Sequence, residues 1–133
     1  MTVKKIFADD EFIDVSGSGY EMNGEFFKDN KKINIKEENF FEIFFNIVVL
    51  CNDANLEIDN KDNDTKIIGS GTESALLVLG EKAGISKEDL PFVRIEEIPF
   101  SSERKMMSVL CKSEKKQFVY SKGALEYLKL MNL

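Results

Sequence analysis

The stretch KMMSVLCKSEKKQFVYSK (residues 105–122) contains two segments typical of β-strands, and their arrangement decides the fold that we expect. Residues 105–112 and 117–122 are rich in apolar and β-forming residues. The four residues between them, SEKK, have the length of a hairpin connection. A third strand is expected just upstream, in FVRIEEI (residues 92–98). Neighbouring strands joined by short links indicate an antiparallel sheet.

Further segments on both sides of this stretch predict the remaining elements. VKKIFADDEFIDV (residues 3–15) predicts a hairpin that turns at Asp9 and Asp10. Residues 34–53 predict one helix with an Asn34–Glu37 capping box, and residues 57–66 predict a polar loop. GTESALLVLGEKAG (residues 71–84) predicts a helix in which Thr72 is the N-cap and Gly84 follows the C-terminus.

The order of these elements is strands, helices, strands and a final helix over residues 123–133. This order favours an α+β fold in which an antiparallel β-sheet is flanked by helices, rather than an alternating βαβ sheet. A chain of 133 residues fits one domain, which we expect to span residues 1–133.

Charge is distributed unevenly along the chain, which has a net charge of −6. Residues 1–93 carry ten basic and 19 acidic residues, whereas residues 94–122 carry seven basic and four acidic ones. The overall negative charge argues against nucleic acid as a partner. A local basic region on an acidic body favours a small anionic ligand, although a solvated charged surface would give the same pattern.

Residue types that are rare or absent exclude several functions. The chain has no histidine, which excludes Ser-His-Asp and Cys-His nucleophiles as well as His-ligated metals. Cys51 and Cys111 lie within apolar runs and are expected to be free, buried thiols. The longest apolar run, residues 47–51, is far too short to span a bilayer.

The glycine-rich segment SGSGYEMNGEF (residues 16–26) invites comparison with phosphate-binding loops. Its glycines do not have GxGxxG spacing, and no Gly-Lys-Ser/Thr ending follows them. We therefore interpret this segment as a plain turn.

A candidate binding site emerges from residues in three separate segments. The ring of Phe100 can stack on a planar base, and Lys105 and Lys122 can supply positive charge to a phosphate. The two lysines lie near the same end of adjacent strands if the predicted hairpin forms. Gly123 would let a ligand approach the backbone closely. Glu73 can accept a hydrogen bond from an exocyclic amine, although the dipole of its helix alone would also explain an acid there.

Three motifs in the chain, in the order GTESALLVLGEKAG, IPFSSERKMMSV and YSKGALE, closely resemble the nucleotide-binding domain of P-type cation-transporting ATPases of the calcium-pump-like subfamily. The segment LCNDA (residues 50–54) also resembles one that precedes the Thr-Glu motif in this family. The resemblance implies that the following residues bind ATP: Thr72, Glu73, Phe100, Ser102, Arg104, Lys105, Met107, Lys122, Gly123 and Ala124.

The resemblance also implies individual roles. Phe100 would stack on the adenine, and Glu73, helped by Thr72, would contact its amino group. Lys122 with the Gly-Ala pair after it would line the inner pocket, whereas Lys105 would reach the phosphates.

Two departures from the family pattern affect these roles. Met107 would pack near the ring, as in the family. Ser102, however, stands where the family often has an arginine that contacts phosphate. Arg104 would have to replace this contact. Gly71 stands where many members have proline, which would affect only the stiffness of the loop.

By this resemblance, the chain is a C-terminally shortened ATP-binding domain, cytoplasmic in an integral membrane pump and itself monomeric and not membrane-inserted. The family's phosphorylated Asp-Lys-Thr-Gly-Thr motif is absent from the sequence, so the chain is expected to bind ATP without hydrolysing it. Its expected partners are ATP and the phosphorylation and actuator domains of the parent chain, and Mg²⁺ would be ligated mainly outside these residues. The alternative is a non-catalytic domain whose basic hairpin docks an acidic protein surface.

Overall fold

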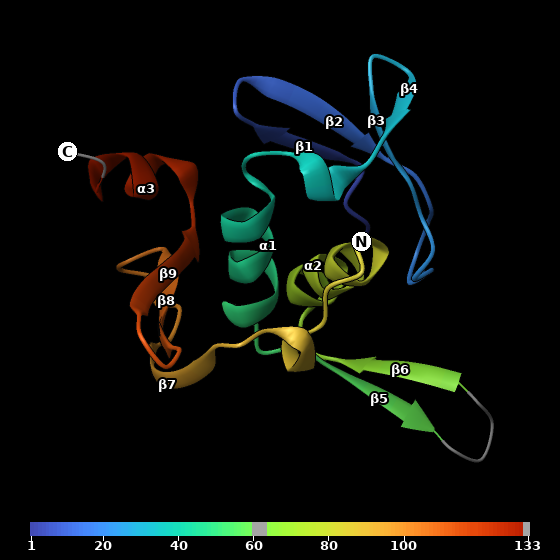
Figure 1. Cartoon of the computed structure of the whole chain (residues 1–133). Coiled ribbons are helices and arrows are strands. Elements are labelled where there is room, and N and C mark those ends of the chain that lie inside the picture. Colours follow the sequence, from blue (N-terminus) through green and yellow to red (C-terminus); the bar gives the residue numbers. More distant parts are fainter. Residues whose placement is uncertain (60–63, 132–133) are drawn as a thin grey trace.

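The computed structural model describes residues 1–59 and 64–131, which form three antiparallel sheets with helices packed between and beside them (Figure 1). The strands are β1 (Lys5–Ala8), β2 (Glu11–Val15), β3 (Phe26–Lys28), β4 (Lys31–Ile33), β5 (Asn55–Asp59), β6 (Asp64–Ile68), β7 (Val93–Ile98), β8 (Met106–Lys112) and β9 (Gln117–Gly123). The helices are α1 (Phe41–Leu50), α2 (Gly71–Lys82) and α3 (Leu125–Met131), with short 3₁₀ turns at Ile35–Glu37 and Lys87–Asp89. The expected α+β class with antiparallel pairing is confirmed.

The N-terminal sheet has the order β1-β2-β3-β4 and contains two tight hairpins. The predicted hairpin is confirmed: Ala8 pairs with Glu11, and both Asp9 and Asp10 have positive φ angles, as the preferred two-residue hairpin turn requires. The hairpin of β3 and β4 was not predicted. It uses the same geometry at Asp29 and Asn30, but its three-residue strands are too short to leave a clear sequence pattern.

The predicted single helix over residues 34–53 is wrong, because the chain breaks between a 3₁₀ turn and α1. Asn34 caps the 3₁₀ turn by accepting a hydrogen bond from the backbone N–H of Lys36. Glu38 then adopts an extended conformation, and its carboxylate forms an ion pair with Lys28 of β3. The chain therefore changes direction at Glu38, beside a contact with a distant segment, before α1 begins at Phe41.

The predicted helix near residues 71–84 is confirmed, but its N-cap is Ser70 and not Thr72. The side chain of Ser70 accepts a hydrogen bond from the backbone N–H of Glu73, so that Thr72 lies within the first turn. Gly84 follows the helix with φ of 79°, the left-handed conformation that a glycine adopts at this position.

The predicted polar loop over residues 57–66 is also wrong where the structure describes it. β5 and β6 pair as a hairpin from Asn55↔Ile68 to Asp59↔Asp64, while residues 60–63 lie outside the described residues. The many charged residues of this segment conceal its strand character, since only one side of a two-stranded ribbon needs to be apolar.

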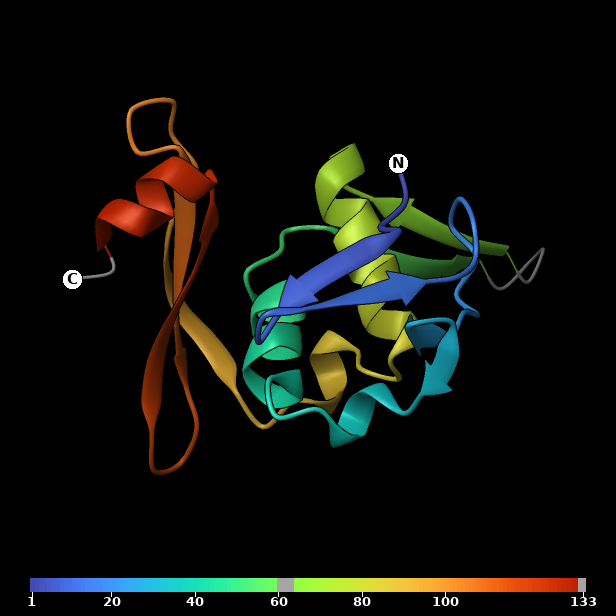
Figure 2. The ribbon, with the colours of Figure 1, turned by 90° about the horizontal axis from the view of Figure 1, so that it is seen from above.

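The C-terminal sheet has the predicted three strands in the order β7-β8-β9. Arg94 pairs with Cys111, and a bulge between Arg94 and Glu96 follows. The SEKK segment closes the β8–β9 hairpin as expected, with Lys112 opposite Gln117. The helix α3 contacts β9 and lies on the side of the molecule away from α2 (Figures 1 and 2).

The helix α1 lies between α2 and the C-terminal sheet, as Figures 1 and 2 both show. Its deepest side chains are therefore Phe45 and Val49, which are completely buried. Both cysteines are free and buried, as predicted from the sequence.

The glycine-rich segment after β2 encloses the side chain of Lys82, whose ammonium group donates to the carbonyl of Ser16 (2.8 Å). A β-carbon at Gly17 or Gly24 would lie 2.9 or 2.8 Å from atoms of this lysine. The glycines therefore make room for a side chain of the protein, which supports the interpretation of the segment as a turn.

The contact of α1 with α2 predicts that replacing Gly80 by alanine destabilises the protein, although alanine usually stabilises a helix. A β-carbon there would lie 2.6 Å from Cγ1 of Val49 and 3.1 Å from the carbonyl oxygen of Ile85. Alanine is favoured over glycine in helices by about 1 kcal/mol, yet overpacking a rigid contact costs about 1–3 kcal/mol. We expect Gly80→Ala to lower the free energy of unfolding by about 1 kcal/mol, as measured by urea denaturation.

The matched control is Gly71→Ala on the same helix, where an added β-carbon would have no neighbour within 4 Å. This variant should be as stable as the parent or slightly more so. If both variants were equally stable, the two helices would not be in the contact described here.

Candidate functional site

A cavity of about 560 Å³ lies where the start of α2 faces the C-terminal sheet. This volume is in the range of small-molecule sites. One wall comes from the helical part of the chain and consists of Asp53, Ser70, Thr72 and Glu73. The other wall belongs to the C-terminal sheet and the residues next to it, and consists of Phe100, Met107, Lys122, Gly123 and Ala124.

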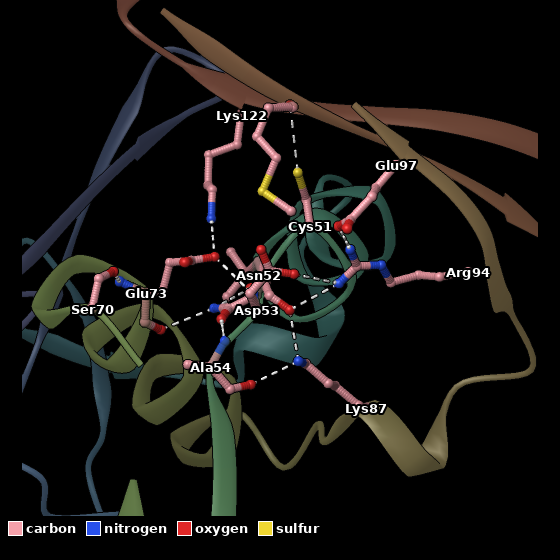
Figure 3. Close-up of polar contacts among 12 residues, drawn as sticks. Cys51, Asn52, Asp53, Ala54, Ser70, Glu73, Lys87, Arg94, Glu97 and Lys122 are labelled. Carbon is pink, nitrogen blue, oxygen red and sulfur yellow. Dashed lines mark hydrogen bonds and ion pairs between the residues drawn. The ribbon is translucent and has the colours of Figure 1, made fainter. Parts of the chain in front are cut away.

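The carboxylate of Glu73 is fixed at the junction of the two walls. Its Oε2 accepts a hydrogen bond from the backbone N–H of Asp53 (2.7 Å) and another from Nζ of Lys122 (3.0 Å). Figure 3 shows Lys122 reaching from the sheet toward Glu73 on α2. The two side chains are only 20% and 23% exposed, so this ion pair is better shielded from solvent than a surface pair.

The main chain around Glu73 is held by Asn52, whose side chain is completely buried. Its Nδ2 donates to the carbonyl oxygens of Val48 (3.1 Å) and Glu73 (2.9 Å), and its Oδ1 accepts from the backbone N–H of Ala54 (2.8 Å). One amide group thus joins the end of α1, the first turn of α2 and the residue that precedes β5 (Figure 3).

Two cationic side chains hold the same segment from the opposite direction. Nζ of Lys87 donates to the carbonyls of Asn52 (2.6 Å) and Ala54 (2.7 Å). Nη1 of Arg94 donates to Asn52 O and to Oδ1 of Asp53, both at 3.1 Å. Burial and, to a lesser degree, the charge of Arg94 lower the pKa of Lys87.

The sheet wall is attached to the helical part through Met107, which lies opposite Lys122 in the β8–β9 pairing. Sγ of Cys51 is 3.6 Å from the carbonyl oxygen of Met107, a distance that fits a weak S–H hydrogen bond. Burial raises the pKa of the Cys51 thiol, against the opposing charges of Lys122 and Arg94. Cys51 therefore acts as a packing residue and not as a nucleophile.

Phe100 and Gly123 are the exposed residues of the sheet wall. Phe100 follows β7 and its side chain is 60% exposed, so that one large aromatic ring is accessible to a ligand. A β-carbon at Gly123 would lie 2.4 Å from the carbonyl oxygen of Lys105 and equally close to Cβ of Met106. Only glycine fits this position without a shift of the backbone.

Seven of the ten residues predicted to bind ATP thus lie together along the cavity, and three do not. Arg104 turns away: its Nη2 donates to Oγ of Ser108 (2.9 Å), which is itself 2.8 Å from Oγ of Ser121. Ser108 directly follows the cavity residue Met107 in β8, and consecutive residues of a strand point to opposite faces. The guanidinium group of Arg104 therefore lies on the face of the sheet opposite the cavity.

The other two residues lie in the turn between β7 and β8. Ser102 is exposed. Lys105 has a φ angle of 57° and closes the turn, with its N–H donating to Ser101 O (2.8 Å). Its carbonyl accepts from the N–H of Ala124 (2.9 Å), which places its backbone beside the cavity without making it part of the wall.

Sequence reasoning missed two wall residues, Asp53 and Ser70. Asp53 belongs to the LCNDA segment, whose resemblance to the family was a signal for the segment but not for this residue. Ser70 was missed because the sequence pattern favoured Thr72 as the N-cap of the helix.

Comparison with known proteins agrees with the motifs. The family model described as P-type ATPase, cytoplasmic domain N, matches residues 40–129. A calcium-transporting ATPase of Bacillus subtilis (strain 168) is 35% identical over 131 residues, and calcium-transporting ATPase type 2C member 1 of Homo sapiens is 33% identical over 135 residues. The cation-transporting ATPase pma1 of Synechocystis is 32% identical over 135 residues.

These alignments cover 95–96% of this chain but only 14–15% of the relatives, so the chain spans about one seventh of their length. Within the described residues, no helix has both the length and the apolar character needed to cross a membrane. The match to the family model and the identities over nearly the whole chain show that it belongs to the family of the cytoplasmic N domain of P-type ATPases.

Proposed function

We propose that the chain binds ATP in the cavity between α2 and the C-terminal sheet, as the nucleotide-binding part of a cation-transporting P-type ATPase that carries calcium. The observation that supports this most strongly is the convergence of Glu73, Phe100 and Lys122, which come from three separate segments, around one cavity of about 560 Å³. A carboxylate, an accessible aromatic ring and a cation are the groups that an amino-purine nucleotide requires.

The base would stack on Phe100, with Met107 packed near the ring. Glu73 would accept from the amino group of adenine, helped by Thr72 in the same helical turn. Oε2 of Glu73 already accepts two hydrogen bonds, so Oε1 is the oxygen assigned to the ligand. Lys122 would line the inner pocket beside base and sugar.

The phosphates would extend from the cavity past the turn between β7 and β8. Like charges repel, so the triphosphate avoids the wall with Asp53 and Glu73 and extends toward the basic residues of this turn. Lys105 is the first candidate for a phosphate contact because its carbonyl is bonded to the cavity residue Ala124. The roles proposed for Ser102 and Arg104 require a rearrangement, since neither lies along the cavity.

The domain would position ATP for a reaction completed elsewhere. In the parent pump, the γ-phosphate would be presented to an aspartate in a separate phosphorylation domain, and phosphoryl transfer depends largely on such positioning. The Mg²⁺ that accompanies ATP would neutralise phosphate charge. It would be ligated mainly outside this chain. The isolated chain should bind ATP weakly, with a dissociation constant of roughly 0.1–10 mM.

Removing the ring of Phe100 tests whether the adenine base stacks on this side chain. Stacking contributes about 1–3 kcal/mol per base, so Phe100→Ala should weaken ATP binding by roughly tenfold or more. NMR titration of the 133-residue chain with ATP measures this and should show shifts clustered at Glu73, Phe100 and Lys122.

The matched control is Phe7→Ala, since Phe7 is 59% exposed and lies on β1, outside the cavity wall. It should leave ATP binding unchanged. The alternative function, docking of an acidic protein surface by the basic hairpin, predicts the opposite: binding that depends strongly on salt and is indifferent to Phe100.

A second test separates phosphate from base recognition at Lys105. The substitution of choice is Lys105→Asn, because asparagine tolerates the left-handed conformation that this position requires (φ 57°). Loss of one partly exposed charge should weaken ATP binding about two- to fivefold and leave adenosine binding unchanged. An equal loss for adenosine would mean that Lys105 acts through the backbone turn and not through phosphate.

A further inference from the structure

We infer that Asp53 is a second acceptor for the base, acting beside Glu73 and selecting a 6-amino purine over a 6-oxo purine. This inference rests on the proposed ATP site and assigns its specificity to a residue that the sequence motifs did not single out.

Asp53 is next to Glu73 in space although 20 residues separate them. It lines the same cavity, and its backbone N–H donates to Oε2 of Glu73 at 2.7 Å. The side chain is 57% exposed, so its carboxylate is accessible to solvent. Two carboxylates from different segments therefore form one acidic wall.

The orientation of the Asp53 carboxylate is set by Arg94. Nη1 of the guanidinium donates both to Oδ1 of Asp53 and to the carbonyl of Asn52, while Nη2 pairs with Glu97. A carboxylate offers about four acceptor positions on its two oxygens, so the single bond from Arg94 leaves capacity for a ligand. The side chain is thus preorganised and does not need to be ordered upon binding.

The donors of the ligand match the acceptors of this wall. An exocyclic 6-amino group has two N–H donors, and Glu73, already bonded through Oε2 to Lys122 and Asp53, has Oε1 for one of them. Asp53 supplies the acceptor for the other. A 6-oxo group is itself an acceptor and would face two carboxylates without a proton between them, which is unfavourable.

The charge of the wall also decides which end of the nucleotide it receives. A triphosphate is repelled by Asp53 and Glu73, whose charges are only partly neutralised by Arg94 and Lys122. The amino end of the base is the part of ATP that an acidic wall attracts.

The test compares ATP with inosine triphosphate, which differs by having a 6-oxo group, on the 133-residue chain and on Asp53→Asn. Binding is measured by NMR titration or calorimetry. Asparagine keeps the size of the side chain but replaces one acceptor oxygen with a donor. ATP binding should weaken about three- to tenfold while inosine triphosphate binding stays the same or strengthens, so that the ratio of the two affinities falls.

The control variant is Asp14→Asn, since Asp14 is a similarly exposed carboxylate that pairs with Lys5 far from the cavity wall. It should leave the ratio unchanged. Because the ratio is taken within one variant, partial unfolding of Asp53→Asn lowers both affinities together and does not imitate the expected result.

Two results would overturn the inference. An unchanged affinity for ATP in Asp53→Asn would show that Asp53 makes no contact with the ligand, and equal weakening of both nucleotides would show a structural role or a contact with the sugar. Either result leaves the proposed function intact if Phe100→Ala still weakens ATP binding. Loss of the Phe100 dependence would instead refute the proposed function itself.

Discussion

The structure depends on the buried amide of Asn52. An amide without partners in the interior costs about 1–3 kcal/mol, and both Nδ2, with two acceptors, and Oδ1 of this side chain have partners among the described residues. These bonds fix the end of α1 relative to the first turn of α2. They also fix the direction of the next peptide, whose N–H belongs to Asp53 and points at Glu73. A single side chain therefore sets both the backbone and the carboxylate of the helical wall.

The cavity is formed by two walls, and charged side chains join one wall to the other. Lys122 reaches Glu73 from the sheet, and Arg94 reaches Asn52 and Asp53 from β7. Each bridge pairs a cation of the basic C-terminal segment with a carboxylate or carbonyl of the acidic part of the chain. Part of the uneven charge distribution seen in the sequence is thus used inside the protein, which leaves fewer cations for a ligand than composition alone suggests.

Local patterns were sufficient for most elements but not for the geometry between them. The hairpins at residues 3–15 and 105–122 and the helix after Ser70 followed from spacing and turn residues, because their stabilising contacts lie nearby in sequence. The break before α1 coincides with an ion pair between Glu38 and the distant Lys28, which no local pattern records. For the same reason, the sequence did not predict Asp53 as a site residue. Its position depends on contacts with Glu73 and Arg94, which are 20 and 41 residues away in the chain.

The position of Arg104 limits the phosphate contacts that the cavity by itself can offer. Its guanidinium is held by Ser108 on the opposite face of β8, and its Nη1 is buried with no hydrogen-bond partner among the described residues. To reach the cavity, this guanidinium would have to give up its hydrogen bond to Ser108 and move to the other face of the sheet, so it is not positioned as a phosphate ligand in this structure. The groups that remain in the wall, a ring and two carboxylates with one lysine, suit a base better than a triphosphate. In the proposed function, this division has a direct consequence: the chain retains the nucleotide by its base and leaves the phosphates exposed, which is the arrangement that transfer to an aspartate in another domain requires.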